Sequence, residues 1–253
     1  MTGKVYNTFL GDVLWQVAHP VTPPLTENEV HVWQIRIGEN LELLHNFSAL
    51  LNQSEKQRGS KYLQQCDRDR FVISRGAQRV ILAKYLNTDA ARMEFALGEN
   101  KKPYIATPAG SQLQFNVSHS GDWILIAVSQ LHVGSDLEYV DAEFHFDDIL
   151  PEHFSSEEIS YINERDKTKR FYQLWTRKEA LLKATGQGLG EHLQMTPALD
   201  GVHGIHPSLV GNNADWVTQT FNLADNYIGS ITVEGNAARL QFWRIDFSGI
   251  IFY

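Results

Sequence analysis

The chain has 253 residues, of which 43% are hydrophobic and 21% charged, a composition that excludes a wholly disordered protein. Its formal net charge of −8 disfavours a general nucleic-acid-binding protein. Because the single Cys66 excludes an internal disulfide and no apolar stretch is long enough to span a bilayer, the sequence predicts a cytoplasmic protein that binds neither nucleic acid nor membrane.

The first half of the chain shows strand, helix and strand patterns in turn. Residues 1–29 carry no clear periodicity, whereas residues 29–37 alternate apolar and polar side chains, which predicts a half-buried strand. Residues 41–86 have a helical pattern with breaks near 52–54 and 66–67, and Ser54 with Gln57 suggests a capping box. Residues 115–117 and 123–128 predict two strands separated by a turn at 118–122.

The second half shows a similar succession. Residues 133–140 predict a strand, and Ser155 with Glu158 has the spacing of a capping box at the start of a helix. Residues 168–185 form the clearest helical segment, which Gly186 should end. Residues 227–233 and 239–247 predict two further strands.

The two successions indicate an internal duplication. A strand, a helical region and a strand occur at 29–37, 41–86 and 123–128, and again at 133–140, 168–185 and 227–233. The sequence therefore predicts an α+β fold of two similar subdomains, residues 1–130 and 131–253. Because such halves could supply the symmetric interface themselves, we expect a monomer.

Two acids in the strand at 133–140 are candidate metal ligands. Successive side chains on a strand alternate faces, so Asp136 and Glu138 project the same way while Leu137 points to the other face. Carboxylates this close repel each other unless a cation or protons lie between them, and oxygen ligands of this kind suit Mg²⁺. The alternative is a solvated strand edge that carries two ordinary acids.

The helix at 168–185 adds a third acid and an amine. Trp175, Glu179 and Lys183 are spaced four residues apart and therefore share one helical face. Together with the strand acids they would complete a metal–phosphate site in which Lys183 stabilises charge on a phosphate. The alternative is a surface Glu–Lys pair beside a core tryptophan.

A phosphate-containing substrate also needs cationic anchors. Arg70 and Arg75 lie on the first long helix, and Lys102 lies in a loop that Pro103 stiffens. Ser118 and His119 lie in the predicted turn. Each residue alone has an ordinary explanation as an exposed cation or a hydrogen-bonded structural side chain.

In combination, these segments resemble the signature blocks of the Sfp-type 4′-phosphopantetheinyl transferases. The blocks are Asn116-Val-Ser-His119, Gly134-Ser-Asp136-Leu-Glu138 and Trp175-Thr-Arg-Lys178-Glu179-Ala-Leu-Leu-Lys183, and the resemblance covers about residues 29–245. It implies two α/β halves about a pseudo-twofold axis, with coenzyme A and Mg²⁺ in the cleft between them.

The resemblance also implies roles for the candidate residues. The metal would be held by Asp136, Glu138 and Glu179, and the catalytic residues would be Glu179 and Lys183. Coenzyme A would contact Arg70, Arg75, Lys102, Pro103, Ser118, His119, Asp136 and Lys183. Two positions depart from the family pattern, because Ser135 replaces an apolar residue and Lys101 stands where glycine is common.

The implied reaction transfers 4′-phosphopantetheine from coenzyme A to a serine of an acyl or peptidyl carrier protein and releases 3′,5′-ADP. Glu179 could serve as metal ligand, as general base or as both. Fatty-acid, polyketide and nonribosomal-peptide carriers all remain open. An acidic carrier helix could dock on a basic run formed by Arg165, Lys167, Lys169, Arg170, Arg177 and Lys178, which could equally be a solvated helical face.

Two other functions compete with the transferase. A Mg²⁺-dependent nuclease or phosphohydrolase could use the same acids, although Val140 occupies the position where an acid-x-Lys nuclease would have its lysine. A non-catalytic module that binds coenzyme A or a nucleotide is the second alternative. An apo-carrier incubated with coenzyme A and Mg²⁺ gains mass only if the protein is a transferase.

Overall fold

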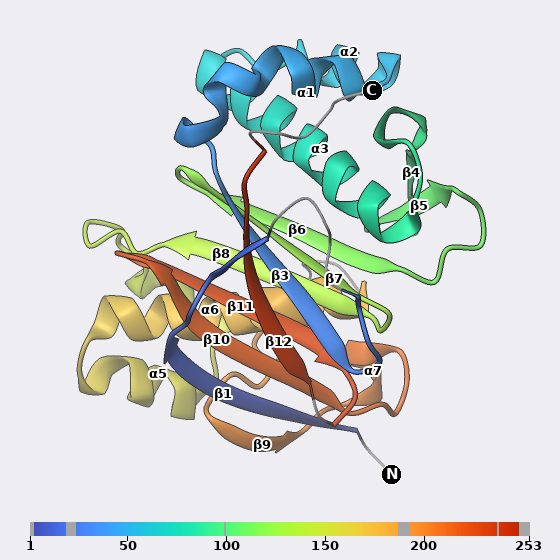
Figure 1. Cartoon of the computed structure of the whole chain (residues 1–253). Helices are drawn as coiled ribbons and strands as arrows, with labels where there is room; N and C mark the ends of the chain where they lie inside the picture. Colours follow the sequence, from blue (N-terminus) through green and yellow to red (C-terminus); the bar gives the residue numbers. More distant parts are fainter. Residues whose placement is uncertain (1–2, 19–23, 99, 187–192, 237, 248–253) are drawn as a thin grey trace.

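The computed structural model describes residues 3–18, 24–98, 100–186, 193–236 and 238–247. Two five-stranded sheets stack in the centre, and helices cover the outer face of each (Figure 1). The first sheet has the order β2 Gln16–Ala18, β12 Arg239–Ile245, β3 Glu29–Arg36, β7 Trp123–Ser129 and β6 Gln114–Ser120. The second has the order β8 Val133–Tyr139, β11 Tyr227–Glu234, β10 Trp216–Ala224, β1 Lys4–Asp12 and β9 Gly201–Gly204.

The helices form two outer layers. The first sheet carries η1 Gly38–Leu43, α1 Leu44–Leu50, α2 Gln53–Gly59 and α3 Gln65–Leu86. The second carries η3 Asp147–Ile149, α4 Leu150–His153, α5 Ser156–Glu164, α6 Lys167–Thr185 and α7 Pro207–Val210. A small hairpin of β4 Glu94–Leu97 and β5 Pro103–Thr107 follows η2 Ala90–Arg92. None of the helices in the described ranges is both long and apolar enough to cross a membrane.

The core is divided by the two sheets. On β3, Val30 and Val32 face the second sheet, where they pack with residues such as Leu137, whereas Trp33 and Ile35 pack against the α1–α3 layer. Both faces of β3 are therefore covered, and polar His31 and Gln34 are buried too, so the prediction of a half-buried strand was wrong. Trp33 and Ile35 occupy the positions on β3 that correspond to Asp136 and Glu138 on β8 under the duplication, and both are buried.

The duplication appears in the strand order. The antiparallel unit β3-β7-β6 of the first sheet has the same order as β8-β11-β10 of the second. Each unit is then extended by a strand from the other end of the chain, because β12 joins β3 and β1 joins β10, both in parallel. The division at residue 130 stays a prediction, but sheet pairing crosses it in both directions.

Most predicted elements are confirmed, with small changes at their ends. The strands at 29–37, 123–128, 133–140, 227–233 and 239–247 correspond to β3, β7, β8, β11 and β12, and the helix at 168–185 is α6, which ends at Gly186 with φ 71°. The capping box of Ser155 and Glu158 is present. The other capping box is made by Asn52 and Glu55, so the prediction of Ser54 with Gln57 was wrong.

Six strands were not predicted, namely β1, β2, β4, β5, β9 and β10, and in β1 and β10 the reason is that polar side chains face inward. Residues 1–29 are not irregular throughout, since they contain β1, in which the amide of buried Asn7 donates to the carbonyls of Pro197 and Leu199. In β10, the hydroxyls of buried Thr218 and Thr220 bond to Thr232 and Ser230 of β11. The turn at 118–122 is also shorter than predicted, because β6 continues to Ser120 and only Gly121 and Asp122 remain outside the strands.

The two sheets are joined at β6 and β8 by side chains rather than by a backbone ladder. Asn116, Ser118 and Ser120 of β6 accept hydrogen bonds from the backbone N–H groups of Ser135, Leu137 and Tyr139, at 2.9, 3.1 and 2.9 Å. These bonds satisfy the edge of β8 that β11 does not pair, and we call this arrangement the strand junction. The hydroxyl of Ser135 also bonds to Asn116, which accounts for serine at this buried position.

Gly134 lets β8 lie directly against α6. A Cβ atom at this position would overlap the backbone of Ala180 and Ala184, so no larger residue fits without moving the helix. Asp136 and Glu138 lie on the same face of β8 as Gly134 and therefore also face α6. The close packing of this strand and helix determines where the candidate site forms.

Candidate active site

A pocket of about 310 Å³ forms where β8, β6 and α6 meet, and we call it the acidic pocket. Asp136 and Glu138 enter it from β8, and Glu179 and Lys183 enter it from α6. Its lining also includes Val117, Ser118, His119, Leu137 and Trp175. The strand acids and the helical stripe that the sequence singled out therefore lie side by side.

Asp136 is at the centre of the polar contacts. The Nζ atom of Lys183 lies 2.5 Å from Oδ1 of Asp136 and 3.9 Å from Oε2 of Glu179. The hydroxyl of Ser118 donates to the same Oδ1 at 3.2 Å. The Asp136 side chain is only 4% exposed, and its second oxygen, Oδ2, is buried without a hydrogen-bond partner.

The other two carboxyl groups have raised pKa values. Burial, followed by the charges of Asp136 and Glu179, raises the pKa of Glu138 to about 7, although Lys183 opposes the shift. Burial and then Asp136 raise the pKa of Glu179 to about 7. Burial works against the ammonium of Lys183, but the surrounding carboxylates outweigh it and raise its pKa. The pocket therefore holds more negative charge than one lysine balances.

These features fit a divalent cation in their chemistry. Three carboxylates offer only oxygen ligands, and Oδ2 of Asp136 is a buried acceptor without a partner. Over the described parts of the chain, however, no three His, Cys, Asp or Glu side chains are placed closely enough to hold a metal ion. Ligation by Asp136, Glu138 and Glu179 together would therefore require at least one of these side chains to rotate.

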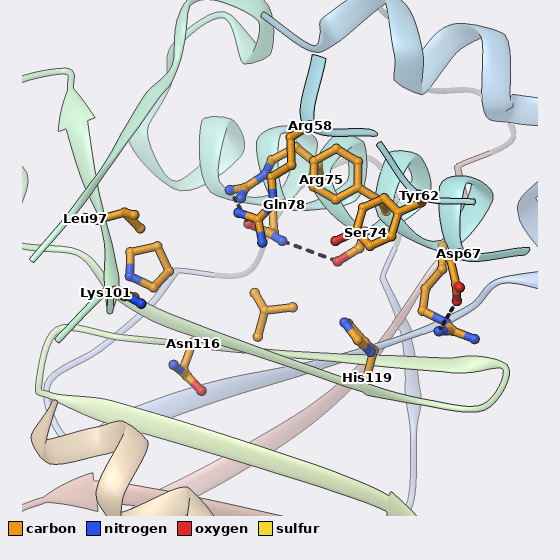
Figure 2. Close-up of a pocket in the computed structure, with 14 residues that line it drawn as sticks. Arg58, Tyr62, Asp67, Ser74, Arg75, Gln78, Leu97, Lys101, Asn116 and His119 are labelled. Carbon is orange, nitrogen blue, oxygen red and sulfur yellow. Dashed lines mark hydrogen bonds and ion pairs between the residues drawn. The ribbon is translucent and has the colours of Figure 1, made fainter. Parts of the chain in front are cut away.

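A second pocket of about 280 Å³ lies under α3 and collects positive side chains (Figure 2), and we call it the cationic pocket. Arg70, Arg75, Pro103 and His119 line it, as does Lys101. The Nε atoms of Arg70 and Arg75 are buried without hydrogen-bond partners, although Nε of Arg75 lies 3.4 Å from Oε1 of Glu55 and Arg70 forms an ion pair with Asp67. Burial lowers the pKa of Arg75, against the opposing charge of Glu55 and with a smaller contribution from neighbouring arginines, and burial and Arg70 lower the pKa of His119. An anion in this pocket would relieve the repulsion.

Several lining residues of the cationic pocket were not predicted. Ser74 and Gln78 lie four residues apart on α3 in series with Arg70, so the helical spacing was a usable signal. Arg58 of α2 and Tyr62 reach the pocket from outside α3, and no local pattern in the sequence marks them (Figure 2).

A third pocket, of about 500 Å³, connects the other two. It shares Lys101, Pro103 and Val117 with the cationic pocket, and Val117 and Lys183 with the acidic pocket. The three pockets thus form one groove between the two halves of the protein. The structure brings all the predicted site residues to this groove, and their roles stay predictions.

Lys102 lines this groove, but its ammonium group already has partners. Nζ donates to the carbonyls of Val133 and Ala184 at 3.1 and 2.7 Å, and burial lowers the pKa of Lys102 to about 8. It therefore ties the loop before β5 to β8 and α6. The neighbouring Lys101 is exposed and has φ 62°, the left-handed conformation that glycine adopts most easily.

Half of the predicted basic run is buried and paired inside the protein. Arg177 donates to Thr220, to the carbonyl of Ala198 and to Asp200. Lys178 and Arg170 are buried as well, in ion pairs with Glu158 and Glu164 respectively. The prediction that all six residues form a basic face was therefore wrong, and Arg165, Lys167 and Lys169 remain accessible near the start of α6.

Comparison with known proteins gives a consistent result across the chain. The family model described as the 4′-phosphopantetheinyl transferase superfamily matches residues 132–231, and the one described as 4′-phosphopantetheinyl transferase, N-terminal, matches residues 40–131. The chain is 30% identical over 232 residues to the 4′-phosphopantetheinyl transferase HetI of Nostoc sp., which covers 89% of this chain and 97% of that protein.

Two further relatives agree. The chain is 32% identical over 244 residues to a phosphopantetheinyl transferase of Thraustochytrium sp., covering 85% of this chain and 84% of that protein. It is 27% identical over 146 residues to the 4′-phosphopantetheinyl transferase Sfp of Bacillus subtilis, covering 56% and 63%. Fold, site and similarity together show that this chain belongs to the 4′-phosphopantetheinyl transferase superfamily.

Proposed function

We propose that this protein transfers the 4′-phosphopantetheine group of coenzyme A to a serine of an acyl or peptidyl carrier protein, with Mg²⁺, and releases 3′,5′-ADP. The observation that carries the proposal is the groove, which joins the cationic pocket to the acidic pocket with the half-buried Lys183. The 3′-phosphoadenosine end of coenzyme A would lie in the cationic pocket and its pyrophosphate beside Lys183.

The reaction needs a base and a stabilised leaving group. The carrier serine oxygen attacks the β-phosphorus of coenzyme A, the bond from that phosphorus to the bridging oxygen breaks, and 3′,5′-ADP leaves with the electron pair. Glu179 accepts the serine proton, for which a pKa of about 7 suits it at neutral pH. Lys183 lies among the carboxylates and places its positive charge near the phosphate oxygens.

Asp136, Glu138 and Glu179 would hold the metal ion. When bound, Mg²⁺ would neutralise charge on the pyrophosphate and on the three carboxylates. Proton acceptance and metal ligation compete for Glu179, whereas Asp136 has a free buried oxygen and is better suited to permanent ligation.

The carrier would dock near the start of α6. Arg165, Lys167 and Lys169 are accessible there, although Lys167 also pairs with Asp147. Lys167 and Lys169 lie in the first turn of α6, where positive charge is unfavourable, and the N-cap residue Asp166 offsets only part of that charge. An acidic partner would compensate for that cost, and we propose that the protein acts as a monomer in the cytoplasm.

The test is incubation of the protein with coenzyme A, Mg²⁺ and an apo-carrier, followed by mass spectrometry. We expect the carrier to gain one phosphopantetheine group, and we expect Asp136→Ala and Glu179→Ala to abolish the gain. Lys4→Glu, an exposed change on β1, serves as a control that should keep full activity. Hydrolysis of coenzyme A without a gain would indicate a phosphohydrolase, and binding without turnover a non-catalytic module.

A further inference from the structure

The strand junction contains a repeated unit that links β6 to the acids of β8. The hydroxyl of Ser118 accepts from the N–H of Leu137 and donates to Oδ1 of Asp136, at 3.1 and 3.2 Å. The hydroxyl of Ser120 accepts from the N–H of Tyr139 and donates to Oε2 of Glu138, at 2.9 and 3.4 Å. Each serine therefore contacts one acid and the backbone N–H of the next residue.

The unit fixes the direction of the hydroxyl proton. A serine hydroxyl has one proton and accepts through its lone pairs. Because the backbone N–H can only donate, it holds the serine oxygen as an acceptor and leaves the proton for the carboxylate. The bond occupies one carboxylate oxygen and leaves the other for a ligand, as Oδ2 of Asp136 already shows.

The hydrogen bond from a serine hydroxyl restricts the Glu138 side chain more than it restricts Asp136. Asp136 is also held by Lys183, whereas Ser120 provides the only hydrogen bond found for the Glu138 carboxylate among the described residues. A free glutamate side chain loses conformational entropy when it is ordered. A partner that orders it in advance reduces that loss when a ligand binds.

We propose that Ser120 is a positioning residue that orients Glu138 for metal binding, as Ser118 orients Asp136. This inference rests on the proposed function, because it takes Glu138 as a metal ligand. Ser118 has the same double role, and its single proton is engaged by Asp136, so its hydroxyl can donate to a phosphate only by releasing that carboxylate.

The alternative is that Ser120 only joins the strands, and Asn116 offers a matched control. Asn116 makes the same bond to β8, accepting from the N–H of Ser135, but it contacts no carboxylate. Loss of Ser120 should leave the fold intact, because Tyr139 is 44% exposed and water can replace the lost acceptor for its N–H.

The experiment titrates the purified protein with Mn²⁺, without coenzyme A, and follows free Mn²⁺ by electron paramagnetic resonance. We expect Ser120→Ala to raise the Kd about tenfold and Ser120→Thr, which keeps the hydroxyl, to restore it to within about twofold. Asn116→Ala should lower the melting temperature and leave the Kd unchanged. In turnover, the Mg²⁺ concentration for half-maximal rate should rise in Ser120→Ala while the KM for coenzyme A stays constant.

An unchanged Kd in Ser120→Ala would overturn the inference and leave Ser120 with the structural role alone. A parallel rise of the Kd in Asn116→Ala would also overturn it, because the effect would then come from the strand junction as a whole. If the wild-type protein binds no Mn²⁺ and transfers phosphopantetheine in EDTA, the proposed metal site itself is wrong. That failure appears in the wild type and so is separate from the first two.

Discussion

At the scale of single residues, the acidic pocket is arranged for ligand binding at the expense of stability. Asp136, Glu138 and Glu179 are held close together and largely out of water, and only Lys183 balances them. The raised pKa values of Glu138 and Glu179 reflect this cost, since a carboxyl group that resists ionisation is destabilised in its charged form.

Glu138→Gln tests this cost. In the folded protein the pKa of Glu138 is about 7, above the ordinary value of 4.5, so between pH 4.5 and 7 the folded state binds a proton that the unfolded state has lost. The stability that this protonated carboxyl group contributes is lost as the pH rises through 7. The neutral amide avoids the loss, so in EDTA the variant should be more stable than the wild type by about 1–2 kcal/mol at pH 8. Chemical unfolding at pH 8 and pH 5 measures this, and a gain that persists at pH 5 would contradict it.

Lys101 provides a second residue-scale test, because it combines a strained backbone with a place in the groove. Lys101→Gly and Lys101→Ala both remove the cation and should raise the KM for coenzyme A alike. Only glycine relieves the left-handed conformation, so the glycine variant should be more stable than the alanine variant by about 0.5 kcal/mol. Thermal unfolding measures the difference, and equal melting temperatures would show that the turn carries no strain.

At the scale of elements, the sequence predicts best where one physical rule acts alone. The common face of Asp136 and Glu138 on β8 and the four-residue spacing of Trp175, Glu179 and Lys183 follow from backbone geometry, and the structure has both. Strand β1 was not predicted because polar Asn7 faces the interior, where its amide donates to carbonyls of residues distant in the sequence.

Buried cations were equally hard to recognise. In the sequence, Arg177 and Lys178 look like exposed members of a basic run, and nothing local shows that Asp200 and Glu158 fold back to pair with them. The same limit applies to Arg58, which reaches the cationic pocket from α2. Where a side chain lies cannot be predicted from local sequence when its position depends on contacts between distant segments.

The start of α6 allows a test in which stability and function change in opposite directions. Lys169→Glu places a favourable charge at the positive end of the helix, so the melting temperature should stay the same or rise slightly. The KM for an acidic carrier should rise several-fold at low salt and the KM for coenzyme A should not, and added salt should reduce the difference. Lys4→Glu, at the far end of β1, is the charge-matched control; an equal effect there would indicate a non-specific charge effect.

At the scale of the whole molecule, the two halves depend on each other. Val5 of β1 pairs with Trp216 of β10, and Glu29 of β3 pairs with Arg239 of β12. The two sheets also share one apolar layer, to which both contribute. The acidic pocket lies at the strand junction, so the candidate site exists only when both sheets are in place.

The isolated segment 1–130 should therefore fail to fold. It lacks β12, and with it Ile245 and Phe247 from the core under α3, and its inner sheet face has no cover. We expect aggregation or the absence of a cooperative thermal transition, measured by size-exclusion chromatography and circular dichroism beside the full chain. A soluble segment with a sharp transition would show that the first sheet is self-sufficient.

The exchange of β1 and β12 between the sheets also governs the order of events during synthesis. When β3 emerges from the ribosome, its neighbour β12 has not yet been translated, and β1 must wait for β10 in the same way. Pairings between such distant segments form slowly, because a long loop must close before they become favourable. We therefore expect neither sheet to be complete until β12 has left the ribosome, and the nascent chain to expose unpaired strand edges up to that point.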